Sequence, residues 1–163
     1  MSTGAHPTLP EEPSTGDQTL KLALEALDAG DYTHSLSFVN EALEQGISWD
    51  AGKAEALNVR GTFKCVNGLF PGFPRSFHSS RFLIGDIDGA KEDLEESIKL
   101  VPGFTQSLVK IASVHMEQGD PEKAFECFDE AIKHNADDPD IYYHRGQGIL
   151  HLCGNSDWRL TLT

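Results

Sequence analysis

Apolar and small residues recur along the chain at spacings of three and four, with polar residues between them. The clearest stretch runs from Thr105 to Ala136. Its apolar and small positions are Leu108, Ile111 and Ala112 in the first half, where His115 replaces the usual aromatic residue, then Ala124, Phe128 and Ala131 in the second half. Such spacing gathers each set on one face of a helix. The stretch therefore predicts two helices that approach closely through their small side chains.

Two independent spacings indicate that this helix pair is repeated. Gly-Asp pairs occur at 30–31, 85–86 and 119–120, and the last two lie 34 residues apart. Small residues at expected helix contacts fall at 23, 61, 112 and 146, with intervals of 38, 51 and 34 residues. A period of 34 residues is that of the tetratricopeptide repeat, a helix-turn-helix unit.

The other units show the same pattern less completely. Their pattern positions are Leu22, Ala23, Ala26, Ser35, Val39 and Ala42 in the first, Leu57, Arg60, Gly61, Lys64, Ala90, Leu94 and Ser97 in the second, and Tyr142, Arg145, Gly146 and Ile149 in the last. The prediction is an all-α tetratricopeptide solenoid with about three repeats and an unfinished fourth. Three repeats are about the minimum for an independently stable stack.

Four segments make up the predicted domain organisation. Residues 1–16 are rich in Pro, Ser, Thr and Gly and read as a disordered leader or linker. Residues 17–147 form the array, and residues 148–163 form an atypical, poorly ordered tail without a further Gly-Asp turn. An irregular insert at 69–84 contains four Phe and two Pro and interrupts the array. It is either an aromatic and basic binding loop or translated non-coding sequence, whose removal restores the 34-residue period.

Charge and composition exclude several kinds of partner and site. The net charge of -13 disfavours nucleic acid and anionic membrane surfaces. No apolar run is long enough to span a membrane, and the N-terminus does not resemble a signal peptide. Cys65, Cys127 and Cys153 are odd in number and far apart, which indicates isolated thiols. No nucleotide, metal or catalytic motif is present, so we expect no enzyme, no cofactor and no metal site.

Helical phase selects a candidate binding surface. In a stack of this kind the first helix of each pair lines the concave face, and its exposed side chains contact the bound protein. The residues at the corresponding phase are Asn58, Thr62, Cys65, Val109, Ser113, Met116, Tyr143 and Gln147. This mixture suits an adaptable groove for amphipathic or extended segments. Packing against neighbouring helices is the alternative interpretation of the same positions.

Several segments resemble one family in order along the chain. They are LNVRGTFK at 57–64, GDIDGAKEDLEESIKLVP at 85–102, KIASVHMEQGD at 110–120, AFECFDEAIK at 124–133 and DPDIYYHRGQ at 138–147. They are similar to the fungal form of the large, 70-kDa-type tetratricopeptide receptors of the mitochondrial outer-membrane import translocase. The resemblance covers about residues 13–147 without the insert. It implies a fragment of a receptor at the cytosolic face of that membrane, with precursor proteins and other translocase subunits as partners.

The sequence departs from this family in three respects. It contains no membrane anchor and no chaperone-docking repeats, and its array is unfinished. In that family, docking of acidic chaperone tails needs Lys and Asn on consecutive first helices. Here Thr62 follows Gly61, so the resemblance does not imply chaperone docking for this chain. A soluble co-chaperone or assembly scaffold, and a mis-predicted fragment without activity of its own, are the alternatives to a precursor receptor.

Overall fold

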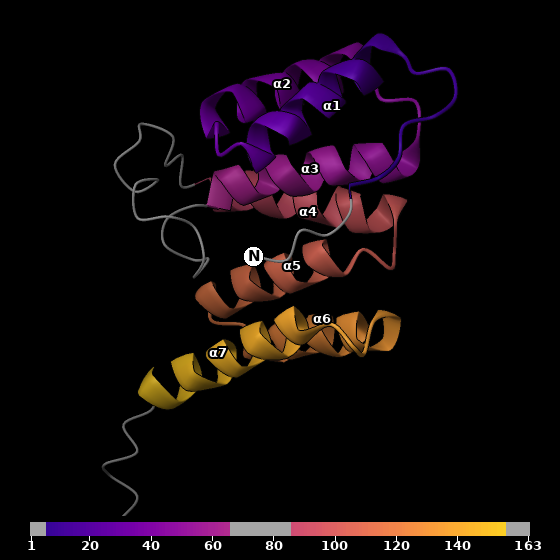
Figure 1. The fold of residues 1–163 in the computed structure, drawn as a ribbon. Helices are drawn as coiled ribbons and strands as arrows, with labels where there is room; N and C mark the ends of the chain where they lie inside the picture. The colour runs from indigo at the N-terminus through magenta and orange to yellow at the C-terminus, as the bar shows by residue number, and fades with distance from the viewer. Residues whose placement is uncertain (1–5, 66–85, 156–163) are drawn as a thin grey trace, which may run out of the picture.

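The described part of the chain folds into seven α-helices. The computed structural model describes residues 6–65 and 86–155, and the predicted insert at 69–84 and residues 156–163 of the predicted tail lie outside it. The helices are α1 (Thr15–Asp28), α2 (Tyr32–Gln45), α3 (Asp50–Cys65), α4 (Ile87–Leu100), α5 (Thr105–Glu117), α6 (Pro121–His134) and α7 (Pro139–Asn155). They stack in chain order, from α1 and α2 at one end to α7 at the other (Figure 1).

The Gly-Asp pairs set where helices end and begin. Gly30 and Gly119 have φ of 77° and 76°, a left-handed conformation that glycine adopts without steric cost. Each ends a first helix, and the next amide bonds back to a carbonyl five residues earlier, as in Asp120 N to His115 O at 2.9 Å. The Asp side chain then caps the following helix, since Asp31 accepts from the His34 amide and Asp120 from the Lys123 amide, each at 3.2 Å.

Consecutive helices form the pairs that the repeat predicts. The closest associations are α1 with α2, α3 with α4, and α5 with α6, and each pair then contacts the next. Small residues allow these approaches: a Cβ on Gly61 would lie 3.0 Å from Leu94 Cγ and 3.1 Å from the Ala90 carbonyl oxygen. Ala112, Ala124 and other small pattern residues are fully buried. The all-α helix-pair solenoid is therefore confirmed.

The second pair replaces part of its apolar contact with charge. Arg60 and Lys64 stand on α3 at pattern positions that α5 fills with Ile111 and His115. Arg60 Nε and Nη2 lie 2.8 and 2.6 Å from the two carboxylate oxygens of Asp93 on α4, and Lys64 Nζ lies 2.9 Å from Oδ2. The hydrogen bond to Asp93 raises the pKa of Arg60. A bidentate pair with a buried carboxylate thus joins these two helices.

Both ends of the array differ from the predicted segments. The leader predicted at 1–16 overlaps α1, which begins at Thr15 after a capping box formed by Ser14 and Asp17. Asp17 also accepts bonds from the Ser48 amide and hydroxyl at 2.8 and 2.6 Å. At the other end, α7 continues to Asn155, so a helix includes the first residues of the predicted tail. The 17–147 boundaries otherwise stay a prediction.

Candidate protein-binding face

The first helices of the successive pairs share one side of the stack. α1 contacts α3, α3 contacts α5, and α5 contacts α7. We call the surface that these four helices form the first-helix face. A continuous surface of this kind is where a helical solenoid presents groups to a bound protein.

Most of the residues predicted to be exposed on this face are buried. Asn58, Thr62, Cys65, Val109 and Met116 are at most 8% exposed, so their expected exposure is wrong. Side chains of other helices cover them, as Ala90 and Ile111 pack beside Cys65, and phase within one helix does not reveal such neighbours. The Asn58 amide, for example, donates to Gln106 Oε1 on α5 at 3.3 Å. The Met116 side chain lies so close to Gly148 on α7 that a Cβ there would meet its methyl group.

The remaining three predicted residues are accessible to differing degrees. Ser113 is half-buried on α5, and its hydroxyl donates to the Val109 carbonyl at 3.1 Å. Tyr143 is 51% exposed, and Gln147 is exposed one turn later on α7. Whether any of the eight residues contacts a bound protein stays a prediction.

A polar network centred on Asn58 joins α3 to α5. Its Oδ1 accepts from Lys110 Nζ at 2.9 Å and from the Ser107 hydroxyl at 3.2 Å. The Ser107 hydroxyl also lies 2.9 Å from that of Ser97, which donates to the Ala54 carbonyl. The network satisfies the buried Asn58 side chain and fixes how the second and third pairs stack.

Two opposite charges are desolvated beside this network. Burial lowers the pKa of Lys110 to about 8, and the attraction of Glu55 partly offsets that shift. Burial likewise raises the pKa of Glu55, against the attraction of Lys110 and of His6. His6 Nδ1 lies 3.9 Å from Glu55 Oε1, so the segment before α1 reaches the same region. A charged group of a bound protein would interact strongly with this weakly solvated pair.

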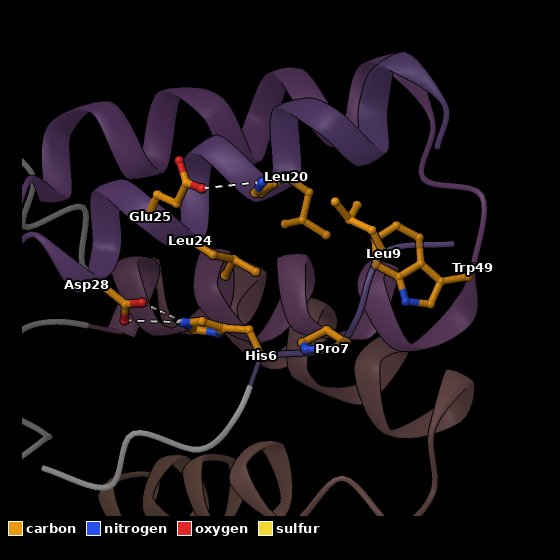
Figure 2. A pocket seen from close by; sticks show the side chains of 9 residues that line it. His6, Pro7, Leu9, Leu20, Leu24, Glu25, Asp28 and Trp49 are labelled. Atoms are coloured by element: carbon orange, nitrogen blue, oxygen red, sulfur yellow. Dashed lines mark hydrogen bonds and ion pairs between the residues drawn. The ribbon is translucent and has the colours of Figure 1, made fainter. Parts of the chain in front are cut away.

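A pocket of about 270 Å³ opens beside α1, between that helix and the segment before it. Its lining residues are His6, Pro7, Leu9, Leu20, Lys21, Leu24, Glu25, Asp28 and Trp49. Figure 2 shows Leu9, Leu20 and Trp49 gathered at one end and His6 directed at Asp28 at the other. The His6 Nε2 atom lies 3.2 Å from both Asp28 carboxylate oxygens. The pocket thus combines an apolar floor with a charged end.

Sequence reasoning missed the two leucines that form this floor. Leu20 and Leu24 precede Asn58 and Thr62 by 38 residues each, the same interval that separates Ala23 from Gly61. They therefore occupy the same repeat positions on the first helix of the first pair. The repeat register is sufficient to identify them, but the first unit matches the pattern loosely, and no site residue is predicted there.

Other kinds of site receive no support within residues 6–65 and 86–155. No three His, Cys, Asp or Glu residues in that range are placed to hold a metal ion. No helix there has the length and apolar character needed to cross a membrane. Cys65 and Cys127 are free, and burial raises the pKa of both thiols, that of Cys65 to about 12.

Comparison with known proteins agrees with this geometry. A family model described as a TPR repeat matches residues 112–147. A solved structure, the crystal structure of MamA, superposes with a TM-score of 0.58 and 18% sequence identity over 83% of this chain and 67% of that one. The chain is an all-α tetratricopeptide-repeat solenoid. Stacks of such repeats act as scaffolds that bind other proteins on an extended surface.

Sequence similarity also extends to curated relatives. The chain is 34% identical over 67 residues to the mitochondrial import receptor subunit TOM70 of two Saccharomyces cerevisiae strains, YJM789 and S288c. The matched stretch is 41% of this chain and 11% of each relative. The similarity therefore covers less than half of this chain and only a small part of those receptors.

Proposed function

We propose that this chain is a precursor-binding part of a mitochondrial outer-membrane import receptor. Precursor proteins would bind on the cytosolic side, with other translocase subunits as further partners. The observation that carries the proposal is the 34% identity over 67 residues to the TOM70 receptors. Since those residues are 11% of each relative, the proposal concerns precursor binding by this segment rather than every activity of the receptor.

The accessible groups of the first-helix face support contact with an apolar client segment. Tyr143 presents a rigid aromatic ring, and an aromatic anchor contributes more binding energy than most side chains. Gln147 and Ser113 offer hydrogen bonds beside it. The five buried predicted residues would act through the shape and polarity of the surface beneath the client: Asn58, Thr62, Cys65, Val109 and Met116.

Binding of a labelled precursor segment to the full chain tests the proposal. The probe is a peptide carrying an internal, apolar targeting signal, followed by fluorescence anisotropy. Tyr143→Asp should weaken binding by about tenfold, because it places a charge against an apolar side chain of the bound precursor segment. Tyr142→Asp is the matched control, since Tyr142 is 47% exposed and lies at a pattern position for helix pairing.

A second probe separates the receptor from a co-chaperone. An acidic peptide that copies a chaperone C-terminal tail should bind at least about tenfold more weakly than the precursor segment, because the net charge of -13 repels it. Tighter binding of the acidic tail would reverse the assignment and favour the scaffold of a soluble co-chaperone. If Tyr142→Asp and Tyr143→Asp weaken precursor binding equally, the first-helix face is not the precursor-binding surface.

A further inference from the structure

The segment His6–Leu9 lies against the first-helix face at its N-terminal end. Pro7 within this segment and Pro10 directly after it restrict the backbone and favour an extended conformation. His6 reaches two acidic groups on different helices, Asp28 at 3.2 Å and Glu55 at 3.9 Å. One short segment thus contacts α1 and α3 in the manner of a peptide laid across them.

The space that remains beneath this segment is shaped for side chains. A volume of about 270 Å³ is below the range of pockets that enclose whole small-molecule ligands, and it accommodates one or two large apolar side chains. Leu20 and Leu24 supply its floor, and Trp49 closes the end nearest Leu9 (Figure 2). Leu9 itself remains 36% exposed, so the segment fills this apolar groove incompletely.

The charged end of the groove specifies the sign of a ligand. Glu25 and Asp28 are acidic, and Lys21 is drawn to Glu25 at 3.8 Å. The Asp28 side chain is 61% exposed while it holds His6, so a competing cation can approach it from solvent. Lysine or arginine carries a permanent charge at neutral pH and would pair with Asp28 and the nearby Glu55 more strongly than histidine does.

We propose that this groove binds an extended peptide segment with Lys or Arg followed three residues later by a large apolar residue, and that His6–Leu9 is its internal competitor. The spacing is the one that the chain itself presents, with His6 on the acidic end and Leu9 at the apolar end. The groove is the first-repeat part of the binding face assigned above, so the inference rests on the proposed function for the origin of the peptide. An internal competitor of this kind lowers the apparent affinity for any peptide that uses the groove. The association constant is multiplied by the fraction of molecules in which the segment is undocked.

The test releases the internal segment in the full chain and offers a copy of it in trans. His6→Asp together with Leu9→Asp repels the acidic end and removes the apolar contact. The probe is a fluorescein-labelled peptide copy of residues 4–11 with arginine in place of the histidine. It should bind the released variant at least about tenfold more tightly than the natural chain. Equal affinity for both proteins, with unchanged thermal melting, overturns the proposal.

Charge reversal on the groove provides the matched comparison. In the released variant, Asp28→Lys should weaken the probe by about tenfold or more, whereas Glu44→Lys, an exposed site on α2, should change it by less than about twofold. Equal losses would show that only net charge matters and would overturn the site. If the variants melt at lower temperature than the natural chain, NMR of the natural chain titrated with excess probe replaces them. The amide chemical shifts of Leu9 and Leu24 should then change, and unchanged shifts would contradict binding in the groove.

The outcome is separable from that of the proposed function. Binding of the probe without binding of any precursor segment would support the groove proposal and contradict the import-receptor proposal. If precursor binds and neither segment release nor Asp28→Lys changes its affinity, the import-receptor proposal is supported and the groove proposal is contradicted.

Discussion

Two glycines at the same repeat position have opposite surroundings. Gly61 on α3 faces Leu94 and the Ala90 carbonyl, and a Cβ there would lie 3.0 to 3.1 Å from their atoms. Gly146 on α7 has no atom within 4 Å of the corresponding position. The same residue type therefore permits close helix packing at one site and leaves an open helix face at the other.

This contrast predicts opposite effects of one substitution. Gly61→Ala should lower the free energy of unfolding by about 1–3 kcal/mol, because the α3–α4 contact is already full. Gly146→Ala should raise helix stability by about 0.5–1 kcal/mol, because alanine loses less backbone entropy and meets nothing. Urea unfolding and amide exchange in α7 measure both effects. A destabilising Gly146→Ala would mean that another part of the protein covers this face.

At the scale of helix pairs, the Asp93 contact replaces a consensus apolar contact. Asp93→Ala should destabilise the protein by about 3 kcal/mol, because it leaves the partly buried Arg60 and Lys64 without their shared carboxylate. Glu96→Ala removes an exposed pair with Lys53 and should cost less than about 1 kcal/mol. Thermal and urea unfolding of the two variants make the comparison.

A repacked variant checks the physical reason for that loss. Replacing Arg60, Lys64 and Asp93 together by leucine should recover most of the stability lost in Asp93→Ala, since apolar groups of similar volume often substitute for a buried ion pair without net cost. A triple variant as unstable as Asp93→Ala would indicate that charge pairing, rather than uncompensated charge, determines the stability of this helix pair.

The helix pairs were predictable from sequence because their signals are local. Gly30 and Gly119, both with positive φ, end α1 and α5, and the adjacent aspartate caps the helix that follows, so a dipeptide marks these two turns. The binding face was less predictable because exposure depends on distant neighbours. Asn58 is buried by side chains about 50 residues away on α5, and His6 docks on Asp28 and Glu55 without any periodic pattern in the leader.

At the scale of the whole molecule, the excess of 26 acidic over 13 basic residues gives a field that attracts positively charged clients. Long-range attraction of this kind accelerates encounter more than it slows dissociation. Raising NaCl from about 50 to about 500 mM should therefore lower the association rate constant of a basic precursor segment by about tenfold, with little change in its dissociation rate constant. Stopped-flow fluorescence measures both rate constants, and a client of equal length without net charge is the control. If the association of the basic segment is as insensitive to salt as that of the neutral one, the acidic surface serves solubility and does not steer clients.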